Sequence, residues 1–178
     1  AAQQEDGVAD TAQTYKQIGA IAFLNDTNES LVAYKRATEL APSDAESWNM
    51  LGHLHYRTGD LSAAADAYNM VLSLGDQRAD KMLIATACGN LGIIERTRGN
   101  LDAAVGYHEK SLALNEALGR KEGMANNYGN LGIVEKTRGN LDAAVEYYEK
   151  SLALEKELGR KEGMASDYSN LGVVEHIR

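Results

Sequence analysis

A few residues in this sequence carry side chains that could do chemistry. His53 and His55 could ligate a metal ion, Cys88 could act as a nucleophile, and residues 119–123 (GRKEG) combine glycine and lysine as phosphate-binding loops do. Two histidines that are two positions apart on a helix point to different faces. No basic partner for Cys88 is evident in the sequence, and residues 119–123 have neither the spacing of a P-loop nor a preceding strand. We therefore predict no metal site, no cofactor and no catalytic residue.

Pairs of carboxylates offer a second route to chemistry, because two of them can share acid and base roles. Glu149 and Glu155 are such a pair, but the pattern around them places both on a solvated outer helix face. On this interpretation Glu155→Ala would be near neutral, whereas Leu131→Ala would cost about 2–5 kcal/mol as a truncation in the core. The sequence thus predicts that the chain is not an enzyme.

Composition excludes further classes of function. The 178 residues carry 18 basic and 26 acidic side chains, a net charge of −8. Such a chain repels phosphate, so nucleic acid and anionic membranes are poor partners, and no apolar run reaches the roughly 20 residues that span a bilayer. A single cysteine allows no internal disulfide. We expect a reducing, cytoplasmic location, and because the sequence starts without methionine or a signal peptide, we expect a fragment or a processed chain.

The residues with the clearest pattern are those that repeat. Residues 91–130 and 131–170 are identical at 30 of 40 positions, and a third copy starts at Leu171. Trp48 and Cys88 are again 40 residues apart, whereas Tyr15 and Trp48 are 33 apart. Cys88 aligns with aromatic residues at a core position, and His108 aligns with Tyr68 and Tyr148, so we expect both to be buried for packing. The chain is therefore an array of repeated units.

Each unit reads as two helices. In residues 128–158, apolar residues recur at three- and four-residue spacing on both sides of Gly139, and Asn140 is a suitable N-cap for the second helix. Glycines are expected to end the first helices at Gly59, Gly99 and Gly139, and the second helices at Gly75, Gly119 and Gly159.

Five further glycines lie inside the first helices, where glycine costs about 1 kcal/mol relative to alanine. They are Gly19, Gly52, Gly92, Gly132 and Gly172. Their recurrence predicts a close approach of two helices at each position, and we expect the opposing small residue to be Ala64, Ala104 or Ala144, twelve positions later.

These positions resemble those of a known family. Trp48, Leu51, Gly52, Gly59, Ala64 and Tyr68, with Ala37 and Pro42 one unit earlier, are similar to the tetratricopeptide repeat (TPR) signature. The 40-residue period exceeds the usual 34 and resembles the long-helix variants of spindle-orientation adaptors, kinesin light chains and bacterial signalling proteins. The extra residues, 120–125 and 160–165, are expected to lengthen the helix that follows.

The resemblance implies an all-α fold, a right-handed TPR superhelix (α-solenoid) of antiparallel helix pairs with about nine helices. It would form a single array over residues 1–178, with repeats at approximately 12–44, 45–84, 85–124 and 125–164 and an unpaired first helix at 165–178. That last helix would leave its apolar face exposed, which predicts a longer natural chain and homo-oligomers that form through this helix.

In this family the first helices line a concave groove that holds a peptide of a partner protein. The family register places the following residues in that groove: Asn90, Asn130, Asn170, His53, Tyr56, Arg57, Ile93, Arg96, Asn126, Ile133 and Lys136. The resemblance thus implies a protein-binding scaffold or adaptor whose partner is a protein or peptide.

The three asparagines Asn90, Asn130 and Asn170 recur at 40-residue spacing. An asparagine amide both donates and accepts, so it can hold a peptide backbone without reading its sequence, as it does in related long-helix arrays. Alternatively, each asparagine bonds a neighbouring helix.

Arg57, Arg96 and Lys136 add one cation per unit, which favours an acidic peptide, unless Glu95 and Glu135 neutralise them. A self-assembling scaffold and a regulatory segment of a larger signalling protein remain alternative functions.

Overall fold

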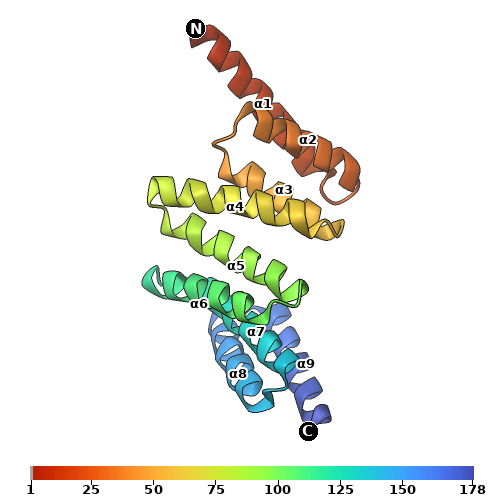
Figure 1. Ribbon diagram of the computed structural model, residues 1–178, viewed down its shortest axis with the longest axis vertical. Helices are drawn as coiled ribbons and strands as arrows, with labels where there is room; N and C mark the ends of the chain where they lie inside the picture. The colour runs from red at the N-terminus through yellow and green to blue at the C-terminus, as the bar shows by residue number, and fades with distance from the viewer. Residues whose placement is uncertain (1) are drawn as a thin grey trace. The chain divides into compact units, whose positions relative to one another are not determined.

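The computed structural model describes residues 2–178, with side chains from Gly7 onward, and these residues form nine helices and no strand. Figure 1 shows the helices in chain order. Their bounds are α1 Ala2–Ala22, α2 Thr27–Leu40, α3 Ala45–Arg57, α4 Leu61–Arg78, α5 Lys81–Thr97, α6 Leu101–Ala117, α7 Lys121–Arg138, α8 Leu141–Leu158 and α9 Lys161–Ile177. The chain divides into two compact units, Ala1–Leu83 and Ile84–Arg178.

Left-handed residues end most of these helices. Gly59, Gly99, Gly119, Gly139 and Gly159 all adopt φ between 66° and 84°, as predicted, because glycine has no Cβ to clash there. The prediction for Gly75 was wrong, since it is buried inside α4. That helix runs on to Arg78 and ends with Ala79, at φ 51°.

The asparagines at the helix starts act differently from the prediction. Asn140 occupies the N-cap of α8, but its side chain does not bond the helix backbone. Its Nδ2 donates instead to Oε2 of Glu135 at 2.7 Å, and Asn100 makes the same bond with Glu95. These asparagines therefore tie two helices together across the turn.

The first unit packs α1 against α2, α2 against α3 and α3 against α4. Its core includes Tyr34, Leu51, Leu54 and Ala67. Gly19 lies against the ring of Tyr34, and a Cβ added to Gly19 would stand 2.7 Å from that ring. Gly52 lies against the ring of Tyr68 in the same way, and its added Cβ would stand 2.5 Å from the ring. The glycines thus allow a tyrosine ring to lie flat on the preceding helix.

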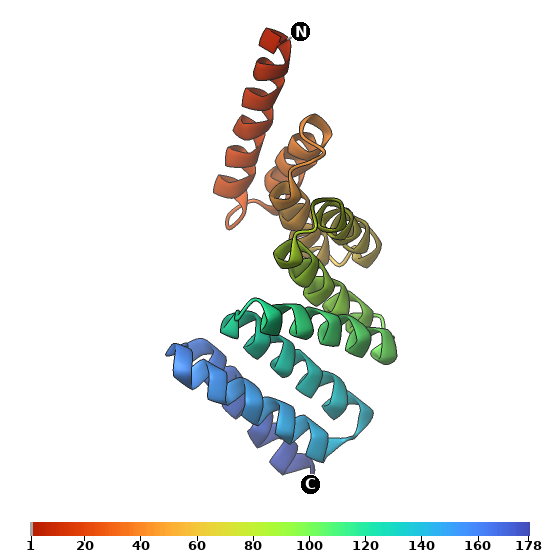
Figure 2. The same cartoon turned by 90° about the vertical axis from the view of Figure 1, so that its left-hand side faces the viewer.

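The second unit repeats this arrangement. In it α6, α7, α8 and α9 pack in succession, as Figure 2 shows from another side. A Cβ at Gly92 would stand 2.6 Å from the His108 ring, and one at Gly132 would stand 2.6 Å from the Tyr148 ring. The predicted close approach is therefore present at Gly92 and Gly132 but absent at Gly172, which has nothing within 4 Å, and the prediction of an opposing alanine was wrong. The opposing group is an aromatic ring sixteen positions later, which is wide and flat enough to need the glycine.

The lengthened first helices are confirmed. α7 begins at Lys121 and has 18 residues, whereas α3 has 13. The added turn brings residues 121–125 alongside α6, and residues 161–165 extend α9 in the same way.

Several large apolar or aromatic side chains of α9 are exposed. Tyr168, Val173 and Ile177 are 52%, 44% and 56% exposed, and no atom lies within 4 Å of where a Cβ of Gly172 would stand. Val174 is fully buried and packs with Ala144 and Tyr148 of α8. The expectation that the last helix exposes apolar side chains is confirmed.

Candidate functional site

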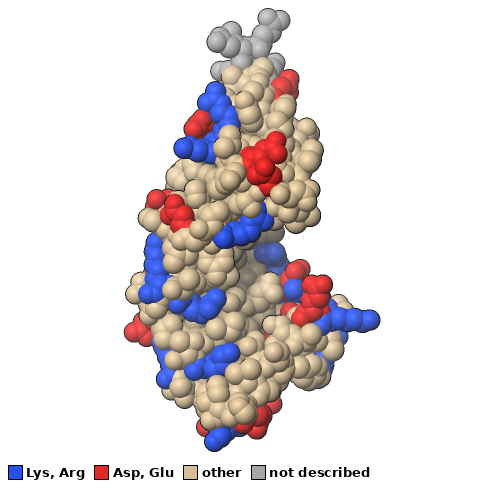
Figure 3. Space-filling model, turned by 90° about the vertical axis from the view of Figure 1, so that its right-hand side faces the viewer, with Lys and Arg blue, Asp and Glu red and all other residues tan. Residues whose placement is uncertain are grey.

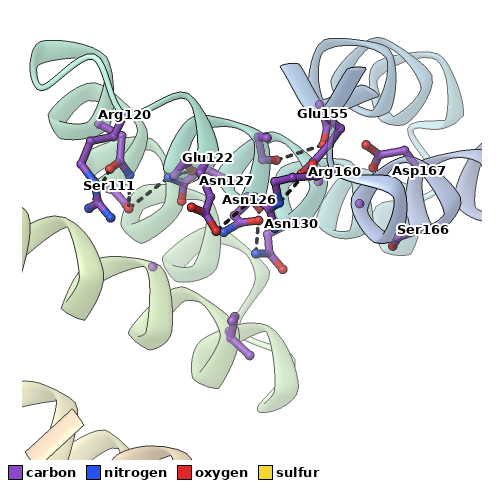
Figure 4. A pocket seen from close by; sticks show the side chains of 18 of the residues that line it. Ser111, Arg120, Glu122, Asn126, Asn127, Asn130, Glu155, Arg160, Ser166 and Asp167 are labelled. Atoms are coloured by element: carbon purple, nitrogen blue, oxygen red, sulfur yellow. Dashed lines mark hydrogen bonds and ion pairs between the residues drawn. The ribbon is translucent and has the colours of Figure 1, made fainter. Parts of the chain in front are cut away.

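The second unit contains a cavity of about 490 Å³, which we call the polar cavity. Its lining comes from α5, α7 and α9 and from the inward sides of α6 and α8 (Figure 4). The polar residues that line it are Thr86, Asn90, Ser111, Asn115, Arg120, Glu122, Asn126, Asn127, Asn130, Ser151, Glu155, Arg160, Ser166, Asp167 and Asn170. Ile93 and Ile133 supply apolar surface.

Six residues that the sequence placed in a groove line this cavity together: Asn90, Ile93, Asn126, Asn130, Ile133 and Asn170. Two other predicted residues, Arg96 and Lys136, are half-buried and lie one turn beyond Ile93 and Ile133 on the same helices. Lys136 Nζ lies 3.4 Å from Oδ1 of Asn170. The structure thus brings the three repeated asparagines of α5, α7 and α9 to one cavity. Their contact with a peptide stays a prediction.

One asparagine of this set is held by its own helix. Asn130 Nδ2 donates to the backbone oxygen of Asn126 at 2.9 Å. That bond uses one of its two amide protons and leaves the Oδ1 acceptor to be matched by another donor. This bond fixes the orientation of the Asn130 amide.

His53, Tyr56 and Arg57 lie on α3 in the first unit and are not part of the polar cavity. The Arg57 guanidinium donates to the backbone oxygen of Phe23 at 2.8 Å and lies 4.6 Å from the centre of its ring. His53 Nδ1 lies 3.0 Å from the hydroxyl of Tyr68, and burial lowers the His53 pKa. Arg57 therefore helps to hold the α1–α2 turn on α3.

At one end of the cavity, two amides, a hydroxyl and a guanidinium form a bonded cluster. Asn127 Nδ2 donates to Oγ of Ser111 at 3.1 Å and to the backbone oxygen of Gly123 at 2.8 Å. Asn115 Nδ2 lies 3.3 Å from the same Ser111 hydroxyl, and Arg120 donates to Oδ1 of Asn115 at 3.4 Å. We call these four side chains, Ser111, Asn115, Arg120 and Asn127, the amide cluster. Both asparagines are at least 96% buried.

At the other end, forty residues later, carboxylates replace both amides. Glu155 and Asp167 are 2% and 3% exposed, and with Ser151 and Arg160 they form what we call the carboxylate cluster. Arg160 Nε lies 3.4 Å from Oε2 of Glu155. Figure 4 shows Glu155, Arg160 and Asp167 together at this end and Ser111 and Arg120 at the other. Burial and the neighbouring Glu155 raise the Asp167 pKa, although a hydrogen bond with Ser151 opposes the shift.

The sequence-based placement of Glu155 on a solvated outer face was wrong. Its side chain folds over the first turn of α9, where Gly163 has no side chain to exclude it. Asn115 lies over Gly123 in the same way. The helical pattern alone could not show this, because the lengthened α9 covers a face of α8 that a shorter helix would leave in solvent. Glu149, the other member of the pair, is exposed.

Sequence reasoning also missed Asn115, Asn127 and Asp167, yet one signal was present. The two near-identical repeats differ at only ten positions, and four of these pairs include a cavity residue: 115/155, 126/166, 127/167 and 129/169. Four of the ten differences between the repeats thus lie at the cavity.

Two other candidates for chemistry are packed into the core. Cys88 is buried, and the His108 ring is fully buried against Gly92. Burial, with Arg96 nearby, lowers the His108 pKa to about 4, so this ring is neutral at pH 7. Both side chains fill space at repeat positions that are aromatic elsewhere, as the alignment predicted.

Charge on the surface is mixed in sign. Lys and Arg are interspersed with Asp and Glu over the face in Figure 3 and form no single broad basic patch there. Among the described residues no group of three or more His, Cys, Asp or Glu is placed to hold a metal ion. Nor does that part of the chain contain a helix long and apolar enough to cross a membrane.

Comparison with known proteins identifies the repeat. Two family models described as tetratricopeptide repeat match the sequence, one over residues 82–157 and the other over residues 23–80. No curated protein matches.

Several solved structures share the fold. BtubC (BKLC) from P. vanneervenii is 20% identical with a TM-score of 0.75, over 97% of this chain and 82% of that one. MamA is 23% identical with a TM-score of 0.68, over 84% and 81%. Aspartyl phosphate phosphatase F from Bacillus subtilis is 14% identical with a TM-score of 0.84, over 93% of this chain but 45% of that protein. These similarities confirm the predicted all-α helical-repeat fold.

Proposed function

The chain belongs to the tetratricopeptide repeat family, which builds protein-interaction scaffolds, and from this premise we propose that its second unit binds an extended peptide segment of a partner in the polar cavity. The observation that carries the proposal is the convergence of Asn90, Asn130 and Asn170, from three successive first helices, on one cavity.

The chemistry of the lining suits a peptide backbone. An extended peptide presents N–H donors and C=O acceptors along both edges, and each asparagine amide can satisfy one of either kind. Ile93 and Ile133 offer apolar contact beside the amides. A volume of about 490 Å³ lies within the range of sites that enclose small ligands, which is enough for a few residues of a peptide.

The experiment that tests this proposal compares partner recovery by the wild-type chain with recovery by the double variant Asn90→Ala and Asn130→Ala. A partner captured from lysate by the immobilised chain is then measured directly by calorimetry. We expect at least about a tenfold loss of affinity in the variant, since two hydrogen bonds of about 1 kcal/mol each are removed. Asn25 and Asn69 lie outside the cavity, and their replacement by alanine is the matched control. Equal affinity of all three proteins would contradict the proposal.

A second candidate function, self-association, is favoured by one observation. The exposed side chains of Val173 and Ile177, one turn apart on α9, form an apolar strip that another copy could cover. Sedimentation of the chain over a range of concentrations tests it. Val173→Glu would abolish a concentration-dependent mass if α9 forms the contact, and a constant monomer mass in the wild type would remove this candidate.

A further inference from the structure

The two ends of the polar cavity share one arrangement of serine and arginine side chains, but one end has amides where the other has carboxylates. Ser111 and Ser151 make the same bond, donating to the backbone oxygens of Ala85 and Ala125 at 2.7 and 3.1 Å. Arg120 and Arg160 hold equivalent places, before α7 and α9. Within this shared frame, Asn115 and Asn127 at one end correspond to Glu155 and Asp167 at the other. The substitution therefore changes charge and hydrogen-bonding character without a change of architecture.

The amide cluster satisfies itself, whereas the carboxylate cluster does not. Asn127 donates to both Ser111 and Gly123, but a carboxylate at position 167 can only accept. In the described part of the chain, Oδ2 of Asp167 is buried and has no hydrogen-bond partner. A buried, unmatched carboxylate oxygen is costly, and a donor that reaches it would recover that cost.

The local charge balance points to the type of donor. Arg160 is shared between Oε2 of Glu155, at 3.4 Å from its Nε, and Oε1 of the exposed Glu122, at 3.3 Å from its Nη1. One guanidinium thus pairs with two carboxylates, and Asp167 adds a third carboxylate to the cluster, close to Glu155. The deficit of positive charge is a property of the cluster itself and does not depend on the overall acidity of the chain.

The Asp167 carboxylate is also accessible from the cavity. Oδ1 of Asp167 lies 3.8 Å from where a Cβ would stand at Gly129, so the glycine leaves this side of the carboxylate uncovered. Ser151 Oγ lies 3.7 Å from the same point, beside it. A ligand group that enters past Gly129 would meet a carboxylate and a hydroxyl oxygen together.

We propose that the carboxylate cluster accepts a basic side chain, lysine or arginine, of the peptide segment that the polar cavity binds. This inference rests on the proposed function, because it names the chemistry of one residue of that peptide. The ammonium or guanidinium group would donate to the Asp167 carboxylate, which it would reach past Gly129, and reduce the excess negative charge of the cluster. The charge of this basic side chain is opposite in sign to that of the acidic peptide expected from Arg57, Arg96 and Lys136. Of those three cations, Arg57 is bound within the first unit.

A random dodecapeptide library displayed on phage is the probe. Selection is carried out on the wild-type chain, on the double variant Glu155→Asn with Asp167→Asn, and on the control Glu109→Gln with Glu149→Gln. The first variant reproduces the residues at 115 and 127, so the fold already accommodates them. The control removes two exposed carboxylates from α6 and α8 and has the same net charge as the first variant.

We expect peptides selected on the wild type and on the control to share lysine or arginine at one fixed position, and peptides selected on the Asn variant to lack it. Replacing that arginine with neutral citrulline, or that lysine with norleucine, would weaken binding to the wild type at least about tenfold and leave binding to the variant unchanged.

Three other outcomes overturn the inference, and they separate its failure from that of the proposed function. If the selected peptides need Asn90 and Asn130 but show no fixed basic residue, the cavity binds peptides and the carboxylate cluster does not choose them. If basic residues are enriched equally on all three proteins, net charge alone causes the enrichment. If no selected peptide depends on Asn90 and Asn130, the proposed function fails and this inference fails with it.

Discussion

Arg160 Nε lies 3.4 Å from a carboxylate oxygen of Glu155, whose side chain is 2% exposed. This pair closes the turn between α8 and α9 and places a buried carboxylate at the edge of the polar cavity. Charge buried without full compensation lowers stability, and proteins keep such groups where binding requires them. The carboxylate cluster should therefore cost the chain stability in the absence of a ligand.

Asp167→Asn tests that cost. Because the folded chain raises the Asp167 pKa, it binds more protons than the unfolded chain, and the stability contributed by this group falls as pH rises from about 3.8 through the folded pKa. The deficit persists at pH 7. We expect the variant to be more stable at pH 7 by about 1 kcal/mol, because an amide can donate to Ser151 as Asn127 does to Ser111. Urea unfolding measures the difference, which should shrink towards pH 3, and a variant less stable at pH 7 would contradict this.

The glycine beneath Tyr148 offers a test of the packing. Gly132→Ala would place a Cβ 2.6 Å from a fully buried ring, so we expect a loss of about 1–3 kcal/mol despite the better helix propensity of alanine. Gly172 occupies the same place in its repeat but has nothing within 4 Å, and Gly106 is exposed on α6. Alanine at either of these should stabilise by up to about 1 kcal/mol. Equal effects at all three glycines in urea unfolding would show that the ring contact is unimportant.

Ala79 should be a weak point of the first unit. It adopts φ 51° where the later repeats have Gly119 and Gly159, and a left-handed alanine costs roughly 1 kcal/mol. Ala79→Gly should therefore raise the melting temperature, and Gly119→Ala should lower it by a comparable amount. Calorimetry of both variants measures the two melting temperatures. A lower melting temperature for Ala79→Gly than for the wild type would contradict the proposed strain at Ala79.

A structural feature could be predicted from the sequence where residues close in sequence determine it, and could not where packing against another repeat determines it. Helix pairs, the ends at Gly99 and Gly139, and the burial of Leu91 and Leu131 follow from local spacing, and all are observed. Glu155 was misplaced because its environment is made by the next repeat's lengthened helix.

The candidate site shows the same division. The family register placed Asn90, Asn130 and Asn170 in one groove, and in the structure all three line one cavity. Asn127 and Asp167 were missed because only packing between α6 and α7, or α8 and α9, turns them inward.

The end of α4 was missed for a third reason, since Ala79 is not a residue that usually stops a helix.

His108 predicts a dependence of stability on pH. Its pKa falls from 6.5 to about 4 on folding, so the folded chain binds fewer protons, and stability present above pH 6.5 is lost as pH falls towards 4. That change corresponds to about 3 kcal/mol. His108→Tyr, which copies Tyr148, should remove this part of the acid sensitivity in urea unfolding at pH 7 and pH 4.5. His176→Tyr, on the exposed side of α9, should leave the wild-type dependence intact, and identical pH profiles for all three proteins would exclude the buried ring as the cause.

The side-chain amide resonances of asparagine test the central claim most directly. In ¹H–¹⁵N spectra recorded while a library-selected peptide is added, we expect the amide groups of Asn90, Asn130 and Asn170 to shift together and saturate at one stoichiometric equivalent. Those of Asn25 and Asn69, outside the cavity, should stay in place. Saturable binding that leaves the three cavity asparagines unmoved would show that the chain holds its partner on another surface.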